Sequence, residues 1–284
     1  MTIKTDAAGH ERSFAFCAST GRTATMFLAK TLNALPDVVA LHEGHVMGDD
    51  PTPMLPLINF QNRRAWSDPE FAAKTIAPLR AQDVMEKARG EASHLVDIAF
   101  NNAPFFPSLS RLHPHAKFVA IIRRCEGFVR SATIVSGEDL QPAGWPDRDK
   151  PLTDREKFIS LGRLRPVKES AYAADWDSWS AIQRNIWLWS HVNASLLDFV
   201  EAGENRHSLH FEDLAGDAAK FWAQLLNILT LGSEFNIEHC VKKSKVKSNQ
   251  RASYQIGTMS EWTAAEQDLY EQLARPLEAR IYDR

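Results

Sequence analysis

A short polar turn between an apolar strand and a helix holds the residues best suited to chemistry. Phe14–Ala18 is apolar and predicts a buried strand, and apolar residues recur at helical spacing after the turn. Gly21 lies in the turn and can adopt a backbone conformation that a Cβ would disfavour. A turn of this kind leaves N–H groups at the positive end of a helix, which is a site for an anion. Side chains that add charge or hydroxyl donors are Thr20, Arg22, Thr23 and Thr25.

The turn differs from the loop that binds ATP or GTP in P-loop NTPases. That loop reads Gly-x-x-x-x-Gly-Lys-Ser/Thr. Gly21-Arg22-Thr23 lacks the lysine, and no glycine precedes it at the required spacing. A standard nucleoside triphosphate site is therefore disfavoured, and an ordinary strand-to-helix turn with a Ser/Thr cap is the remaining alternative.

A second anion-binding pair is predicted where the most apolar strand ends. Lys117–Ile122 is continuous, apolar and β-branched at its end, which is typical of a central parallel strand. Arg123 follows directly, and Ser131 comes eight positions later on a predicted helix. The two side chains can converge on one anion. The alternative is an exposed arginine and a helical serine without a ligand.

His42 and Glu43 follow the short strand Val38–Leu41, which is the first strand predicted after the polar turn and its helix. Either side chain can take a proton from a hydroxyl group when its pKa lies near neutrality. A zinc protease requires His-Glu-x-x-His, and His42-Glu43-Gly44-His45 is one residue too short. No further ligand cluster is evident, so we expect no metal. A structural role for Glu43, as the partner of a loop N–H or an arginine, is equally open.

The elements that would position these residues alternate between strand and helix. The predicted strands are Phe14–Ala18, Val38–Leu41, His94–Ile98, Lys117–Ile122 and Ser208–Phe211. The main predicted helices are Thr23–Leu35, Pro104–Leu112, Phe128–Val135, Asp177–Ala202, Ala218–Leu229 and Ala264–Arg280. This order predicts an α/β fold with a central parallel sheet of about five strands flanked by helices. Ligands bind such sheets at the carboxyl ends of the strands, where the residues above would gather.

Two of these motifs resemble those of the sulfotransferases that use 3′-phosphoadenosine 5′-phosphosulfate (PAPS). Thr20–Leu28 resembles the 5′-phosphosulfate loop of that family, with Ala24 where the family often has glycine. Arg123 and Ser131 resemble its 3′-phosphate motif, with Arg124-Cys125 where the family often has Asp-Pro or Asn-Pro. The resemblance implies a P-loop-like sulfotransferase architecture.

The resemblance also implies a reaction and the roles of individual residues. The sulfuryl group would pass from PAPS to a hydroxyl or amine of a small organic acceptor, releasing PAP without a metal. Arg22 would offset charge on the leaving oxygens, and His42 or Glu43 would be the base. A basic C-terminal loop closes over the 3′-phosphate in relatives, which implies contacts from Lys247 and Arg251. The phosphosulfate would be held by Thr20, Gly21, Arg22, Thr23, Ala24 and Thr25, and the 3′-phosphate by Arg123 and Ser131.

Length and composition favour one domain over residues 1–284. Residues 137–178 hold four prolines and little periodicity, and predict a cap or insertion over the acceptor site. The net charge of −3 gives no basic field for nucleic acid, and no apolar run approaches the length of a membrane span. Three widely separated cysteines suit a cytoplasmic protein with reduced thiols. The oligomeric state is left open.

Two other functions remain open from the sequence. A P-loop-type kinase or nucleotide hydrolase would need a Walker lysine and a carboxylate for magnesium, of which Asp97 or Asp213 supplies at most the second. A non-catalytic nucleotide-binding protein of the same fold would bind PAP without turnover.

Overall fold

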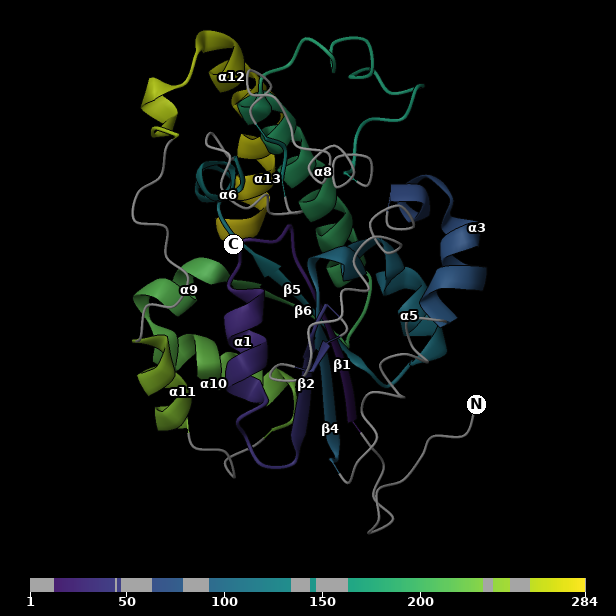
Figure 1. Cartoon of the computed structure of the whole chain (residues 1–284), viewed down its shortest axis with the longest axis vertical. Coiled ribbons are helices and arrows are strands. Elements are labelled where there is room, and N and C mark those ends of the chain that lie inside the picture. Colours follow the sequence, from purple (N-terminus) through teal and green to yellow (C-terminus); the bar gives the residue numbers. More distant parts are fainter. Residues whose placement is uncertain are drawn as a thin grey trace.

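A six-stranded sheet forms the centre of the computed structural model, with the strand order β3-β2-β4-β1-β5-β6 (Figure 1). The strands are β1 (Ser13–Ala18), β2 (Val38–His42), β3 (His45–Val46), β4 (His94–Ile98), β5 (Lys117–Ile122) and β6 (Arg206–His210). Five strands are parallel, as predicted, and the short β3 pairs antiparallel with β2. The structure describes residues 13–43, 45–46, 63–78, 92–133, 144–146, 163–231, 237–245 and 256–283.

The register brings the carboxyl ends of the parallel strands to one edge of the sheet. Cys17 of β1 and His42 of β2 are both opposite Ile98 of β4. Ala18 of β1 is opposite Ala120 of β5. The turn after β1 therefore lies between the residues that follow β4 and those that follow β5, so the sheet itself assembles the candidate site.

Helices cover both faces of the sheet. The described α-helices are α1 (Thr25–Leu32), α3 (Pro69–Phe71), α5 (Phe106–Leu112), α6 (Cys125–Ala132), α8 (Ala181–Glu201), α9 (Phe211–Gly216), α10 (Ala218–Ile228), α11 (Ile237–Ser244), α12 (Ala264–Leu269) and α13 (Arg275–Tyr282). Short 3₁₀ segments are Phe100–Phe105 and Met259–Glu261, and π segments are Ala72–Ile76 and Tyr270–Ala274. None of the described helices is both long and apolar enough to cross a membrane.

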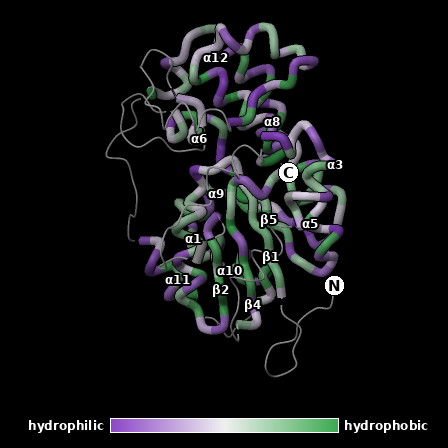
Figure 2. Tube along the Cα trace, turned by 45° about the vertical axis from the view of Figure 1, so that its right-hand side comes forward, coloured by the Kyte–Doolittle hydropathy of each residue, from purple (hydrophilic) through white to green (hydrophobic). Residues whose placement is uncertain are grey.

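Alternation along β1 divides the core into two clusters. Phe16 packs on one face with residues of α5, α6 and α8, and Cys17 packs on the other with residues of α1, α10 and α11. Figure 2 shows the hydrophobic residues gathered along the strands, between these helices. Because both faces are covered, the strands read as nearly continuous apolar runs in the sequence.

Several predicted boundaries are wrong by a few residues. The last strand is Arg206–His210 rather than Ser208–Phe211, because Phe211 begins α9, whose first turn carries Glu212 and Asp213. Acidic side chains favour the N-terminus of a helix. The helix predicted from Phe128 begins at Cys125 and includes Gly127, a residue that usually weakens a helix.

The predicted cap is described only in part. Of residues 137–178, the structure describes 144–146 and 163–178, and the remainder lies outside the described residues. Trp145 and Trp176 of this segment are buried in the cluster on the α8 face of the sheet. The single-domain interpretation of residues 1–284 stays a prediction.

Candidate functional site

The turn between β1 and α1 has an unusual backbone. Gly21, Arg22 and Ala24 have φ values of 83°, 58° and 59°, in the left-handed region. For a residue other than glycine this conformation costs about 1–2 kcal/mol. Ala24 is the N-cap of α1 and gives no side-chain cap to the helix. The first N–H groups of a helix have no acceptor within it, so this end of α1 is suited to an anion.

Hydroxyl groups hold the turn and face its interior. Ser19 Oγ accepts a hydrogen bond from the Gly21 N–H at 2.9 Å, and both residues are buried. Thr23 is fully buried, and its hydroxyl has no hydrogen-bond partner in the part of the chain that the structure describes. A buried polar group without a partner costs about 1–3 kcal/mol. The turn thus carries a donor that a ligand oxygen would satisfy.

Two arginines connect this turn to α6. Arg22 Nε donates to Ser131 Oγ at 3.0 Å, and Arg123 Nη1 donates to the Arg22 carbonyl at 2.8 Å. The Arg123 guanidinium also lies 4.6 Å from the centre of the Phe211 ring. The sequence predicted that Arg123 and Ser131 converge; the structure brings both to Arg22. The two predicted anion sites are therefore one continuous group.

Two further residues position Arg123 and are not among the predicted site residues. The indole Nε1 of Trp189, on α8, donates to the Arg123 carbonyl at 2.7 Å. A Cβ built on Gly127 would lie 2.9 Å from Arg123 Nε, so only glycine leaves the side chain its present place. Gly127 lies in the first turn of α6, and a glycine at that place in a helix is the signal that could have found it.

Arg124 is engaged differently from Arg123. Its backbone N–H donates to Glu212 Oε1 at 2.9 Å, and the next N–H, of Cys125, donates to Glu278 Oε1 at 2.7 Å. The Arg124 guanidinium lies 3.8 Å from Glu278 Oε2 and 4.1 Å from the centre of the Tyr282 ring. Carboxylates thus occupy the N-terminus of α6, and Arg124 faces them rather than the turn after β1.

His42 and Glu43 lie beside the same turn. His42 Nε2 is 3.1 Å from Thr25 Oγ1, in the first turn of α1, and 3.8 Å from Glu43 Oε1. Glu43 has a φ of 53°, and its N–H donates to the Ile98 carbonyl at 3.1 Å. The left-handed residue ends β2 and turns the chain at the edge of the sheet. Both candidate bases are thus held next to the N-terminus of α1.

The other residues named from the sequence do not join the group around Arg22, or cannot be placed. Lys247 and Arg251 lie outside the described residues. Within the described ranges, no group of three or more His, Cys, Asp or Glu residues could hold a metal ion. Asp97 accepts a hydrogen bond from Asn102 Nδ2 at 2.9 Å, and Asp213 from Lys220 Nζ at 3.2 Å.

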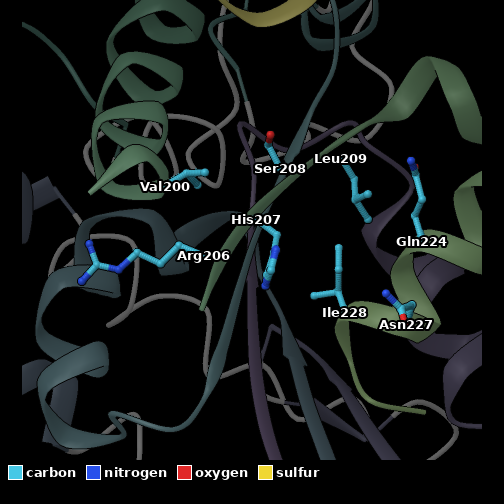
Figure 3. A pocket seen from close by; sticks show the side chains of 8 residues that line it. All are labelled: Val200, Arg206, His207, Ser208, Leu209, Gln224, Asn227 and Ile228. Carbon is cyan, nitrogen blue, oxygen red and sulfur yellow. The ribbon is translucent and has the colours of Figure 1, made fainter. Parts of the chain in front are cut away.

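A cavity of about 370 Å³ lies elsewhere, along the edge strand β6 (Figure 3). Its walls are β6, Val200 of α8 and three residues of α10. None of the predicted site residues lines it, so the chemistry and this cavity are separate features of the molecule. The lining residues are Val200, Arg206, His207, Ser208, Leu209, Gln224, Asn227 and Ile228.

Comparisons with known proteins give no family model and no curated protein that matches this chain. Several solved structures match, and three of them match over most of their length. A sulfotransferase domain from the curacin biosynthetic pathway is 13% identical, with a TM-score of 0.45, over 92% of this chain and 97% of that one. A sulfotransferase domain from the Synechococcus PCC 7002 olefin synthase is 14% identical, with a TM-score of 0.47, over 96% and 98%. A sulfotransferase from Alicyclobacillus acidocaldarius is 15% identical, with a TM-score of 0.44, over 96% and 94%.

Proposed function

We propose that this chain is a sulfotransferase that moves the sulfuryl group of PAPS to a hydroxyl or amine of a small organic acceptor and releases PAP. One observation carries the proposal. The Arg22 side chain meets Ser131, and the Arg123 side chain meets the Arg22 backbone, at the edge where two central strands end. Two guanidinium groups next to an open helix N-terminus form a site for a ligand with more than one anionic group.

The two ends of this cationic group have different tasks in the proposal. The backbone N–H groups of Thr23, Ala24 and Thr25 hold the 5′-phosphosulfate at the N-terminus of α1. Arg22 offsets the charge that develops on the leaving phosphate oxygen. Donors fixed where charge develops are worth about 3 kcal/mol each, which is roughly a hundredfold in rate. Arg123 and Ser131 hold the 3′-phosphate.

Proton removal from the acceptor is assigned to the end of β2. As the acceptor oxygen forms its bond to sulfur, the bond between sulfur and the phosphate oxygen breaks, and PAP leaves with the electron pair. The acceptor proton passes to His42 or to Glu43, and His42 Nε2 lies 3.8 Å from Glu43 Oε1. Thr25 keeps His42 beside the helix that holds the phosphosulfate. In this scheme the arginines and amides supply the positive potential, so the transfer requires no metal.

A cytoplasmic location is part of the proposal. Cys17, Cys125 and Cys240 are free and buried. Unpaired thiols are typical of reducing compartments. Burial raises the pKa of Cys240 to about 11, which keeps its thiol protonated and unreactive.

Calorimetric titration with PAP, AMP and ATP–magnesium tests the nucleotide site. We expect PAP to bind at least about tenfold more tightly than AMP, because AMP lacks the 3′-phosphate and its charge-assisted hydrogen bonds. Arg123→Gln should remove that preference. Arg124→Gln is the matched control, because Arg124 faces Glu278 and Tyr282 instead. Equal affinity for PAP and AMP in the unaltered protein would overturn the proposal, whereas PAP binding without transfer from PAPS to any acceptor would indicate a binding protein.

A further inference from the structure

Three arginines surround one tryptophan near the N-terminus of α8. The guanidinium carbons of Arg163, Arg165 and Arg184 lie 5.9, 5.5 and 5.3 Å from the centre of the Trp145 ring. Trp145 is 5% exposed. We call these four residues the Arg–Trp cluster. The contacts of each guanidinium group indicate what the cluster does.

The Arg–Trp cluster is connected to the proposed site through hydrogen bonds. The Trp145 N–H donates to Asn185 Oδ1 at 2.6 Å, and Asn185 Nδ2 donates to Thr133 Oγ1 at 2.7 Å. Thr133 is the C-cap of α6, two residues after Ser131. On α8, Asn185 precedes by one turn the Trp189 that bonds the Arg123 carbonyl. One helical turn rises about 5.4 Å, so the cluster lies just beyond the edge of the sheet.

Two of the three arginines are held by backbone carbonyls. Arg184 donates to the Trp176 carbonyl from Nη2 at 2.8 Å and from Nε at 3.2 Å, and Arg163 Nε donates to the Gly144 carbonyl. Arg184 Nη2 also lies 3.9 Å from Asp177 Oδ1, but the Asp177 side chain is 93% exposed. Solvent screens an exposed carboxylate, so it offsets little of the charge.

Arg165 differs from its two neighbours. Its side chain is partly buried, and its Nε, which is inaccessible to solvent, has no hydrogen-bond acceptor among the described residues. Burial, and after it the positive charge of Arg63, lowers the pKa of Arg165, while the negative charge of Asp177 acts in the opposite direction. An arginine stays charged in proteins. An N–H donor that is buried, charged and without an acceptor is costly unless a ligand oxygen completes it.

We propose that the Arg–Trp cluster binds an anionic group of the acceptor, either a carboxylate or a phosphate or sulfate ester. This inference rests on the proposed function and names the class of substrate. Arg165 donates to the anionic oxygens, because the planar guanidinium can give two parallel hydrogen bonds to two oxygens of one carboxylate, phosphate or sulfate group. Trp145 and Trp176, whose ring centres are 5.2 Å apart, pack against the apolar part of the same molecule. The acceptor is then a hydroxylated organic anion rather than a neutral alcohol or phenol.

Ligand-observed NMR on the full chain saturated with PAP tests the proposal. PAP fills the phosphate sites at Arg22 and Arg123, so that added anions report on the cluster. We expect benzoate to bind about tenfold more tightly than the neutral benzamide, as one charge-assisted hydrogen bond allows. Phenyl phosphate in a third arm separates a phosphate site from a carboxylate site. Equal binding of benzoate, phenyl phosphate and benzamide would overturn the inference.

Variants of the cluster decide whether Arg165 is responsible. Arg165→Gln should reduce benzoate binding to the level of benzamide, and Arg165→Lys, which keeps the charge, should retain part of the preference. Arg111→Gln is the control, because Arg111 lies at the end of α5 before the amino end of β5. An undiminished preference in a folded Arg165→Gln protein would assign the anion to another residue and refute the proposal.

The outcome also separates this inference from the proposed function. Normal PAP binding without a preference for benzoate would overturn the acceptor class and leave the sulfotransferase proposal intact. Absence of PAP binding would overturn the sulfotransferase proposal, and the inference about the acceptor would fall with it.

Discussion

The substitution Gly127→Ala should displace the Arg123 side chain without destabilising the fold. The Cβ of an alanine would lie 2.9 Å from Arg123 Nε, 3.5 Å from Nη2 and 3.6 Å from Cζ. An ordinary van der Waals contact is roughly 3.5–4.0 Å, so the guanidinium must move by at least about 0.5 Å. The movement pulls Arg123 Nη1 away from the Arg22 carbonyl, which it contacts at 2.8 Å.

The same substitution favours the helix itself. Gly127 lies within α6, and alanine is about 1 kcal/mol more favourable than glycine in a helix interior. The Arg123 head is the flexible end of a long side chain, so moving it costs little in packing. We therefore expect Gly127→Ala to unfold at the same or a higher temperature. Its affinity for PAP should fall by about tenfold to a hundredfold, the equivalent of one charge-assisted hydrogen bond of roughly 1.5–3 kcal/mol.

Thermal unfolding and calorimetric titration with PAP would be measured on the same preparations. Gly216→Ala is the matched control, because a Cβ at Gly216 would meet nothing within 4 Å. Its PAP affinity should equal that of the unaltered protein. If Gly127→Ala binds PAP as tightly as the control does, Arg123 is not held in place for the 3′-phosphate, and the assignment of that residue is wrong.

Three further predictions follow from other parts of the structure. Glu43→Gln and His42→Asn should retain PAP affinity, and the variant that removes the base should lose about 10²–10⁴-fold in kcat with PAPS and an acceptor. If both variants keep the kcat of the unaltered protein, neither residue is the base. Ala24→Gly should raise the free energy of unfolding in urea by about 0.5 kcal/mol, since about 1–2 kcal/mol of left-handed strain is relieved and about 0.5–1 kcal/mol of backbone entropy is lost; a decrease would show that the strain is absent. Burial lowers the pKa of His113 in the folded protein below the ordinary histidine value of 6.5. As the pH falls below 6.5, the unfolded chain therefore binds more protons than the folded one, and the free energy of unfolding decreases. His113→Phe should therefore lose less melting temperature between pH 8 and pH 5.5 than the unaltered protein, and an equal loss would exclude His113 as the cause.

The sequence predicted the centre of the sheet well because the central parallel strands are buried on both faces. Such strands appear as short apolar runs, and the bounds of β4 and β5 are those predicted. The edge strand β6 carries charged and polar residues, so its pattern is weaker and its bounds were wrong. The short antiparallel β3 was missed, because two residues do not form a pattern.

The site was predictable in its composition but not in its contacts. The turn after β1 and the arginine after β5 follow from local patterns. The bond between Arg22 and Ser131 joins residues 109 positions apart. The carboxylates that occupy the N-terminus of α6 come from Glu212 and Glu278, 88 and 153 positions from the N–H groups they accept. No local pattern contains such pairings, because they depend on how helices pack over the edge of the sheet.

The contacts of Glu278 have a consequence for the order of events during synthesis. Glu278 lies on α13, is 9% exposed, and accepts hydrogen bonds from the Cys125 N–H and the Tyr270 hydroxyl. Tyr282, on the same helix, donates to Glu212 at 3.0 Å. A ribosome-bound chain that has released every strand and α9 already holds Glu212, but it still lacks Glu278 and Tyr282, so the Cys125 N–H has no carboxylate to bond. The N-terminus of α6 would then gain its last carboxylate only after α13 has emerged, so an arrested nascent chain could fold its sheet before this helix end is complete.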